Sequence, residues 1–282
     1  MSTFVKIFTM KKTIFIFATI VLNTLIGKTQ AIDSLTIYYF QNFPYAYNEG
    51  GKVKGIEIEI IEEYINWMKQ KKNIALKLSY KPFTEFSSFY NAVKNGSPYV
   101  VGLGSITNTP EREKEVSFSP YYLQNVSVLI TDGRIPTIKN KSAEEVSKVL
   151  NGLNALVVNK SNHTQYLNEL KASYLPNLKI SFTETQSKVL ETIAADKASF
   201  GYVDIVAYWS FLKNNPSKFL KIQKLFSETK EYLSFAMPKN SGNQPYLSEF
   251  FESGFGFTST KTYRQILEKY LGYEIIDAVE IK

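Results

Sequence analysis

Two runs of alternating strand and helix patterns constrain the fold of this chain more than any other feature. Short alternating or β-branched segments predict strands, and longer segments with apolar residues every three or four positions predict helices. In the first run these patterns alternate over residues 34–40, 56–73, 74–83 and 86–96. In the second run they alternate over residues 154–159, 161–174, 178–182, 185–197 and 199–204. The alternation predicts an α/β fold with a sheet that is parallel at least in part.

Two further strand patterns connect the runs. The segment LQNVSVLITDG, residues 123–133, leads out of the first unit, and YLSFAMPKN, residues 232–240, leads back to it before two terminal helices. The sequence therefore predicts two lobes joined by two hinge crossings, near Ser127–Thr131 and near Leu233–Pro238. Lobe 1 is expected over residues 32–128 and 236–282, and lobe 2 over residues 129–235.

The segment GLGSITNTPEREKEVSFSPYY, residues 102–122, carries an arginine in an unusual place. Thr109 and Pro110 predict the N-cap and first residue of a short helix, which puts Arg112 in its first turn. A cation there opposes the helix dipole, and a bound anion would remove the conflict. An arginine can hold a carboxylate through two parallel hydrogen bonds, with Ser105 and Thr107 as further donors.

A structural interpretation of the same arginine is also open. Arg112 can instead lie on a surface helix and pair with one of its acidic neighbours, Glu111, Glu113 or Glu115. The local sequence thus allows either half of a ligand clamp or an ordinary surface ion pair.

The first 31 residues predict a secretory signal peptide. Lys6, Lys11 and Lys12 precede an apolar run over residues 13–26, and the segment ends in the small residue Ala31. The run is shorter than the ~20 residues of a membrane span, so we expect cleavage near Ala31, with an uncleaved anchor as the alternative. Met10 is an alternative start, because KKTIFIF follows it directly.

Charge and cysteine content restrict the location and the partners. The predicted leader contains four lysines and no acidic residue, so its removal lowers the formal charge from +7 to +3. This weak, scattered charge argues against a nucleic-acid partner. The chain has no cysteine, so it forms no disulfide and has no cysteine for a lipid anchor. We expect a soluble, monomeric, periplasmic protein.

The second run places polar residues where α/β sheets bind ligands. Ser161 is the predicted N-cap of the helix over residues 161–174, and Asp204 ends the strand pattern over residues 199–204. Ligands of open α/β sheets bind at the carboxyl ends of strands. We therefore expect both residues near a binding site.

Taken together, these segments resemble a known family. The motif TNTPEREKEVSFSPYY is the specific part, and FPYAY and GIEIEI support it by order and spacing. The chain is similar to the family 3 extracellular solute-binding proteins, the periplasmic amino-acid-binding proteins of ABC importers, over essentially all of residues 32–282. The resemblance implies a two-lobed, type II periplasmic-binding-protein-like fold, no cofactor, and an inner-membrane ABC permease as partner.

The resemblance also implies roles for individual residues. The carboxylate-binding arginine of the family falls on Arg112, with neighbouring hydroxyl and backbone contacts on Thr107 and Ser105. The amino-group-binding aspartate falls on Asp204. The other matched positions are a second-lobe segment at Lys160, Ser161 and Asn162, and ligand-covering aromatic residues at Phe43, Tyr45 and Phe86.

A lone arginine facing a lone aspartate complements the zwitterion of a free amino acid. Charges in a closed, water-poor cleft must be paired to avoid a desolvation cost of several kcal/mol, so a ligand engaged by both lobes would stabilise closure. Lys160 departs from the family, which usually has glycine there. We expect this lysine to narrow the loop or to favour a ligand with a second carboxylate.

Other groups of polar residues do not suggest metal or nucleophilic chemistry. His163 is the only histidine and cysteine is absent, so histidine–cysteine metal sites and serine–histidine–aspartate triads lack their parts. We interpret His163 as a polar residue in a first helical turn. Four acidic residues at helical spacing are interpreted as a solvated face, namely Glu57, Glu59, Glu62 and Glu63.

Two alternative functions stay open beside a non-enzymatic binding protein. Cyclohexadienyl dehydratases share the predicted fold, so an exported lyase is one alternative; it would need an acid in the cleft, for which Glu184 is the candidate. A stand-alone amino-acid sensor domain is the other.

Overall fold

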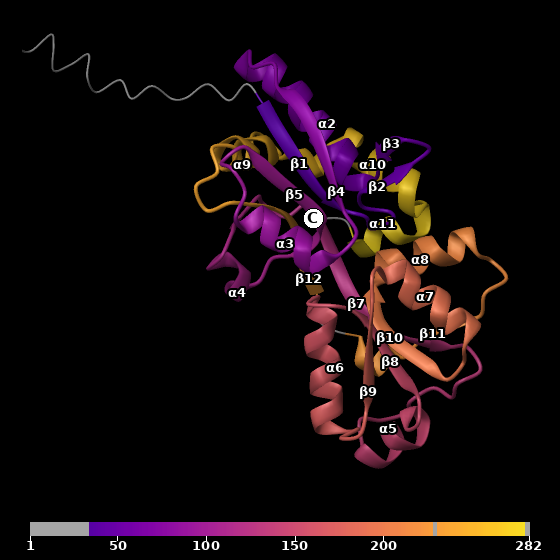
Figure 1. Cartoon of the computed structure of the whole chain (residues 1–282). Helices are drawn as coiled ribbons and strands as arrows, with labels where there is room; N and C mark the ends of the chain where they lie inside the picture. Colours follow the sequence, from indigo (N-terminus) through magenta and orange to yellow (C-terminus); the bar gives the residue numbers. More distant parts are fainter. Residues whose placement is uncertain (1–33, 228–229, 280–282) are drawn as a thin grey trace, which may run out of the picture. The chain divides into compact units, whose positions relative to one another are not determined.

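The computed structural model describes residues 34–227 and 230–279 (Figure 1). The predicted leader and the alternative start at Met10 lie outside these ranges. The main sheet has a first half with strands in the order β4 (Lys77–Phe83), β1 (Ser34–Phe40), β5 (Val100–Thr107) and β12 (Lys230–Met237). It continues through a second half in the order β7 (Leu123–Asp132), β10 (Ser199–Asp204), β8 (Asn154–Val158) and β9 (Lys179–Thr183). We call these parts the first half-sheet and the second half-sheet.

Strand directions follow from the connections. In the first half-sheet, β1 is parallel to β4 and β5, and in the second, β8 is parallel to β9 and β10. The two central strands, β7 and β12, are antiparallel to each other and to their outer neighbours. Helices separate the parallel strands along the chain, as parallel pairing requires. The predicted partly parallel sheet is confirmed.

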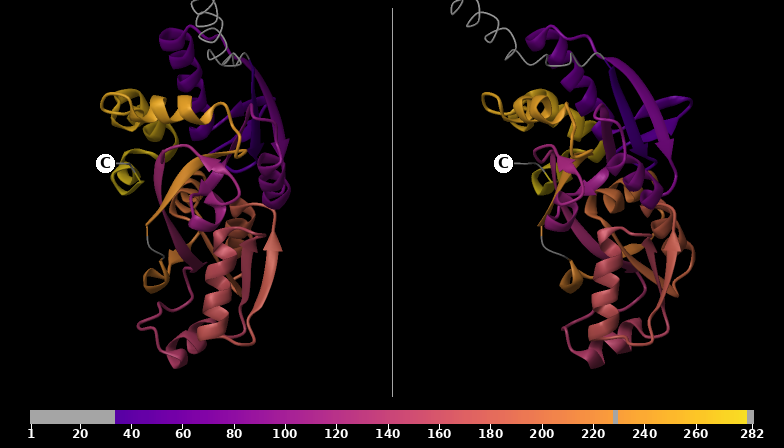
Figure 2. Two further views of the ribbon diagram at one scale, coloured as in Figure 1. Left: turned by 90° about the vertical axis from the view of Figure 1, so that its left-hand side faces the viewer. Right: turned by 60° about the vertical axis from the view of Figure 1, so that its left-hand side comes forward.

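Helices from both ends of the described chain cover the first half-sheet. They are α2 (Ile56–Trp67), its extension η1 (Met68–Lys72), α3 (Phe86–Lys94), α9 (Gln244–Glu252), η3 (Phe257–Ser259), α10 (Lys261–Leu271) and α11 (Tyr273–Val279). The apolar stripe of α2 is fully buried at Ile56, Ile60 and Tyr64, as its period predicts. The yellow C-terminal helices α9 and α10 pack against α2 (Figures 1 and 2).

A second set of helices covers the second half-sheet. It consists of α5 (Ala143–Leu150), α6 (Asn162–Ser173), α7 (Gln186–Ala195), α8 (Ile205–Asn214) and the short η2 (Lys224–Phe226). The sequence patterns did not predict α8, because IVAYWSFL lacks the polar face that reveals a helical period. Val206 of α8 belongs to the core of the first half-sheet, whereas Ala207 and Tyr208 belong to the core of the second. This helix therefore ties the two cores together.

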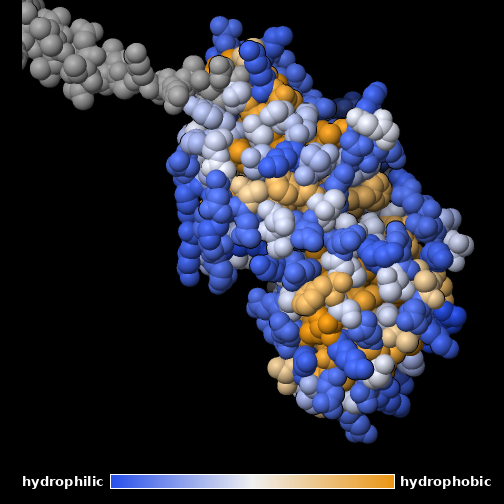
Figure 3. Space-filling view, viewed as in Figure 1, coloured by the Kyte–Doolittle hydropathy of each residue, from blue (hydrophilic) through white to orange (hydrophobic). Residues whose placement is uncertain are grey.

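Short elements complete the fold. They are β2 (Tyr47–Glu49), β3 (Lys52–Lys54), α4 (Pro110–Glu113), β6 (Ser117–Phe118) and β11 (Leu220–Ile222). Gly50 and Gly51 connect β2 to β3 with positive φ angles of 60° and 81°, which glycine adopts without steric cost. The face in Figure 3 is mostly hydrophilic, with apolar patches on both halves. Within residues 34–227 and 230–279, no helix has the length and hydropathy to cross a membrane.

Candidate functional site

A small chamber lies where residues of both half-sheets meet. Its volume is about 30 Å³. Most of the predicted site residues line it, namely Ser105 and Thr107 at the end of β5, Arg112 of α4, Phe86 of α3, Ser161 and Asn162 at the start of α6, and Asp204 at the end of β10. The carboxyl ends of β5, β8 and β10 thus converge at this chamber, as the strand-end rule predicts.

Local sequence builds the Arg112 side of the chamber. Thr109 caps α4, and its Oγ1 accepts a hydrogen bond from the Arg112 backbone N at 3.3 Å. The guanidinium donates from Nη1 to the Thr107 carbonyl at 3.0 Å and lies 5.4 Å from the Phe86 ring centre and 5.5 Å from that of Tyr90. Burial lowers the pKa of Arg112, but arginine starts high enough to stay cationic.

The surface ion-pair interpretation of Arg112 finds no support in the structure. Among the described residues, no acidic side chain lies within ion-pair distance of its guanidinium. Glu115, one of the suggested partners, instead pairs with Lys94 at 2.6 Å. The predicted helix start and the position of the arginine in its first turn are both present.

The two hydroxyl residues before Arg112 contact neighbours of their own. Ser105 has a left-handed φ of 47°, its backbone N donates to Glu57 Oε1 at 3.0 Å, and its Oγ accepts from Asn42 Nδ2 at 2.9 Å. Thr107 Oγ1 donates to Glu231 Oε2 at 3.2 Å. Because the Ser105 Oγ is an acceptor toward Asn42, its own hydrogen can still be donated into the chamber.

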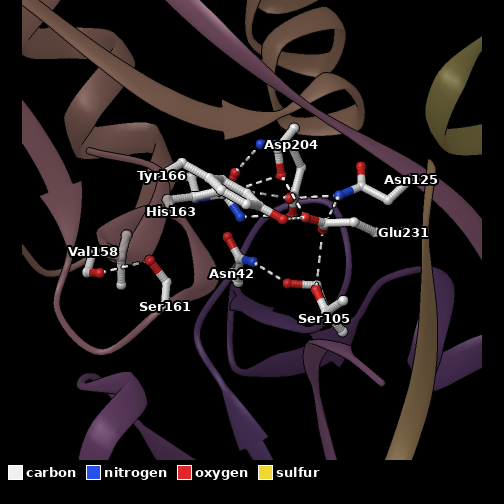
Figure 4. Close-up of polar contacts among 12 residues, drawn as sticks. Asn42, Ser105, Asn125, Val158, Ser161, His163, Tyr166, Asp204 and Glu231 are labelled. Atoms are coloured by element: carbon white, nitrogen blue, oxygen red, sulfur yellow. Dashed lines mark hydrogen bonds and ion pairs between the residues drawn. The ribbon is translucent and has the colours of Figure 1, made fainter. Parts of the chain in front are cut away.

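Asp204 is enclosed by hydrogen-bond donors (Figure 4). Its Oδ1 accepts from Asn125 Nδ2 at 2.7 Å and lies 3.3 Å from His163 Nε2. Its Oδ2 accepts from Gln186 Nε2 at 2.7 Å and from the Tyr45 hydroxyl at 3.3 Å. Burial favours the neutral acid, but these contacts, led by His163, outweigh it and hold the pKa of Asp204 below its usual value. The carboxylate is therefore charged, and each of its two oxygens faces two donor groups.

The structure separates the three aromatic residues expected over the ligand. Phe86 lines the chamber. Tyr45 is fully buried outside the lining, where its hydroxyl contacts Asp204. Phe43 packs edge-on against Tyr47 with ring centres 5.0 Å apart and lines a different surface groove of about 570 Å³. Only one of the three therefore faces the chamber.

Ser161 occupies the N-cap position of α6, as predicted, but its side chain does not cap the helix. Its Oγ donates to the Val158 carbonyl at 2.7 Å instead. The first backbone N–H groups of α6 consequently have no side-chain cap. Uncapped N–H groups at the start of a helix favour negative charge, and Ser161 and Asn162 bring this helix start to the chamber wall.

Sequence reasoning misjudged Glu57. Interpreted as part of a solvated face, it is fully buried and accepts hydrogen bonds from the Ser105 backbone N and the Tyr122 hydroxyl. Burial raises its pKa to about 7, although both hydrogen bonds act in the opposite direction. Glu62 of the same group is exposed, as interpreted. The helical spacing could have predicted this burial, because Glu57 lies on the same face of α2 as the buried residues Ile61 and Tyr64.

Two further polar residues near the chamber were not expected there. His163, interpreted only as a first-turn residue, lines the chamber and is 4% exposed. Glu231, on β12, accepts hydrogen bonds from Thr107, Ser127 and the Tyr166 hydroxyl. Glu231 could have been suspected from the sequence, because it places a carboxylate at the start of a strand that crosses between the two predicted lobes. Within the described residues, no cluster of three or more histidine, aspartate or glutamate side chains could hold a metal.

A sequence profile of the bacterial extracellular solute-binding proteins, family 3, matches residues 35–273. The chain belongs to this family. The family 3 chain is also 27% identical over 165 residues to the "Probable amino-acid-binding protein YxeM" of Bacillus subtilis (strain 168), a match that covers 58% of this chain and 54% of that protein. It thus spans about half the length of this curated relative.

Solved structures share the fold of this family 3 chain. An ancestral arginine-binding protein bound to arginine superposes with a TM-score of 0.67 at 20% identity, over 86% of this chain and all of that one. ArtJ of Geobacillus stearothermophilus, an arginine-, lysine-, histidine-binding protein, has a TM-score of 0.67 at 18% identity, over 87% and 99%. An ancestral amino acid-binding protein described as a precursor of cyclohexadienyl dehydratase has a TM-score of 0.62 at 19% identity, over 84% and 95%. The predicted α/β, type II periplasmic-binding-protein-like fold class is confirmed.

Lys160 adopts a left-handed φ of 58°. Glycine would reach this region without steric cost, whereas a lysine there carries some backbone strain. The Lys160 side chain is exposed and does not line the chamber. The expectation that it selects ligands with a second carboxylate therefore has no support from its position.

An open groove of about 390 Å³ adjoins the chamber of this family 3 protein and shares Phe86 and Val158 with it. Glu184, the candidate acid of a lyase, lies on this outer groove and does not line the chamber.

Proposed function

We propose that this chain is a binding protein that captures a free amino acid, or a similar small zwitterion, between its two half-sheets. The observation that carries the proposal is the chamber itself, whose wall contains the Arg112 cation from one half-sheet and the Asp204 anion from the other. Membership of family 3 and the amino-acid-binding relatives support it.

The ligand carboxylate would bind at Arg112. Among the residues that the structure describes, the guanidinium makes one hydrogen bond, to the Thr107 carbonyl, so most of its N–H groups can reach a carboxylate. Phe86 and Tyr90 flank it and limit the water that would weaken the pair. The Ser105 hydroxyl and the uncapped start of α6 would add donors to the same carboxylate.

The ligand ammonium would bind at the Asp204 end. Because Arg112 and Asp204 belong to different half-sheets, a ligand that contacts both stabilises the closed arrangement. We assign the hinge to β7 and β12, the two strands that connect the predicted lobes over residues 32–128 with 236–282 and over residues 129–235.

The cellular role that fits this site is import. We infer that the protein is exported through its leader, acts in the periplasm as a monomer, and delivers its ligand to an ABC permease rather than transforming it. Glu184, the candidate acid of the lyase alternative, lies on the outer groove rather than on the chamber wall, so its position does not favour that alternative. Neighbouring genes for a permease and an ATPase would favour import over the sensor alternative.

A thermal-shift panel of the twenty standard amino acids tests the proposal. A ligand that binds only the folded protein stabilises it by about 2.7 kcal/mol at a hundred times its Kd, which raises the melting temperature by several degrees. We expect such a shift with at least one amino acid at millimolar concentration. No shift with any of them would overturn the proposal.

A further inference from the structure

A second carboxylate contacts the wall of the chamber without lining it. Glu231 of β12 is 8% exposed. Its Oε1 accepts hydrogen bonds from the Ser127 hydroxyl, at 3.2 Å, and from the Tyr166 hydroxyl. Its Oε2 accepts from Thr107 Oγ1 at 3.2 Å and from Asn125 Nδ2 at 3.4 Å. A carboxylate is unfavourable to bury unless donors surround it, and here each oxygen has two.

On the first half-sheet, Glu231 holds the residue that holds Arg112. Thr107 donates its one hydroxyl hydrogen to Glu231 Oε2, and its carbonyl accepts from Arg112 Nη1 at 3.0 Å. The hydroxyl is therefore not available as a donor to a ligand, although Thr107 lines the chamber. Thr107 instead fixes the guanidinium, and Glu231 fixes Thr107.

On the second half-sheet, Glu231 holds the start of α6. Tyr166 lies in the second turn of this helix, and its hydroxyl donates to Glu231 Oε1 (Figure 4). Ser127 also donates to this oxygen and contacts His163 Nε2 at 3.0 Å, in the first turn of the same helix. Two sets of contacts thus connect Glu231 to the helix whose uncapped start lies at the chamber wall.

Glu231 and Asp204 share one amide group. The Nδ2 of Asn125 carries two hydrogens, and it donates to Asp204 Oδ1 at 2.7 Å and to Glu231 Oε2 at 3.4 Å. The position of Asp204 therefore depends on Asn125 and, through that amide, on Glu231.

Glu231 is thus one residue away from each part of the proposed ligand site, which are Arg112, Asp204 and the start of α6. We propose that Glu231 is a positioning residue for amino-acid binding. It holds Thr107 of β5 and Tyr166 of α6 on one carboxylate, and so sets the spacing between the two sides of the chamber before the ligand enters. A site that is ordered in advance binds more tightly, because less freedom is lost on binding. This inference rests on the proposed function.

Removal of one hydroxyl from each side tests this bridge without a change of charge. In Thr107→Val and in Tyr166→Phe the side chain nearly keeps its shape but loses the hydroxyl that donates to Glu231. Kd is measured by calorimetry, at a temperature where every variant is folded, for each of the twenty amino acids that binds the wild type. We expect about a fivefold loss of affinity in each variant. Glu231→Gln, which loses two acceptor sites to its amide group, should lose about tenfold.

Double substitutions separate a bridge from two direct contacts with the ligand. If Thr107 and Tyr166 act through Glu231, the loss of either breaks the same bridge. The double variant should then bind within about twofold of the weaker single variant, rather than with the roughly 25-fold loss that independent effects would give. Thr107→Val should likewise cost nothing further in the Glu231→Gln background. Additivity of Thr107→Val and Tyr166→Phe would overturn the inference, and this comparison needs no Glu231 variant to fold.

Glu59→Gln is the matched control. Glu59 also accepts from a tyrosine hydroxyl, that of Tyr270, but it lies on the separate groove of about 570 Å³. We expect this variant to bind like the wild type even where it unfolds more easily. An affinity loss equal to that of Glu231→Gln would overturn the inference, because the effect would then not depend on contact with the site.

The same measurements separate this inference from the proposed function. Wild-type affinity in both Thr107→Val and Tyr166→Phe would overturn the positioning role of Glu231 and leave amino-acid binding intact. If the wild type binds none of the twenty amino acids, the proposed function fails, and the inference fails with it.

Discussion

The two charged ends of the chamber are built in opposite ways. Arg112 is placed by its own segment, through the Thr109 cap and the Thr107 carbonyl, and makes few polar contacts. Asp204 is held by side chains from four separate parts of the chain, which are Tyr45, Asn125, His163 and Gln186. We therefore expect Arg112, most of whose N–H groups are unused within the described residues, to contribute mainly to ligand binding. Asp204, whose oxygens already accept hydrogen bonds, should contribute to the stability of the fold as well.

Arg112→Ala should show the largest effect, mainly on binding. Without the guanidinium the ligand carboxylate lies in the chamber unpaired, which costs about 4 kcal/mol, or roughly a thousandfold in affinity. The free protein should lose only about 1 kcal/mol of unfolding free energy, because among the described residues the guanidinium has one hydrogen bond and two aromatic contacts to lose. Calorimetry and urea unfolding measure the two quantities.

Arg112→Lys is the matched control for this experiment. Lysine keeps the charge but cannot form two parallel hydrogen bonds with a carboxylate, so we expect an affinity between those of the wild type and Arg112→Ala. Wild-type affinity in Arg112→Ala would show that the carboxylate binds elsewhere, and the contrast between the two ends would then be wrong.

Asp204→Asn should affect both binding and folding. The amide places a donor where the carboxylate accepts from Asn125 and Gln186, so we expect a loss of about 3 kcal/mol in the free energy of unfolding at pH 7. The pKa of Asp204 is lowered in the folded state, so its contribution is present above the unfolded value of about 3.9 and is lost as pH falls through the folded value. The difference between wild type and variant should therefore shrink below about pH 4. An unfolding free energy equal to the wild type at pH 7 would contradict the structural role.

The same contrast explains how much of the site could be predicted. Arg112 follows from the local pattern of a cap, a proline and a misplaced cation, and its helix start was confirmed. Asp204 could be placed at the end of a strand, but its donors could not be identified, because Asn125 and Gln186 lie 79 and 18 positions away. The periodicity of apolar residues does not show which polar side chains from distant parts of the chain will contact one another.

The helices and strands likewise divide into those that a local pattern predicts and those that depend on long-range packing. Strands and helices with a clear period, such as β1 and α2, agree with the sequence patterns. Helix α8 was missed because both of its sides are apolar, one in each core. Phe43 and Tyr45 were given one role from one motif, yet Phe43 lines a surface groove and Tyr45 is fully buried.

Glu57→Gln tests the buried carboxylate that supports the Arg112 side through Ser105. The pKa of Glu57 is raised in the folded state to about 7, above the unfolded value of about 4.3. Its favourable contribution is therefore full below about pH 4.3 and is lost as pH rises toward 7. Between pH 5 and pH 8 the wild type should lose about 2.5 kcal/mol more unfolding free energy than the variant, which is the linkage free energy that these two pKa values imply. Parallel profiles from urea unfolding would show that Glu57 stays charged throughout.

A pair of aromatic substitutions should give the smallest effect and the sharpest comparison. Phe86 contacts the Arg112 guanidinium and lines the chamber, whereas Phe43 lines a separate groove. Phe86→Leu keeps apolar volume but removes the ring face, so the ligand affinity should fall about fivefold, or about 1 kcal/mol. Phe43→Leu is the control and should bind like the wild type by calorimetry. If both variants lost the same ligand affinity, the groove lined by Phe43 would also take part in binding. The aromatic contact with Arg112 belongs to Phe86 and could not explain a loss in Phe43→Leu.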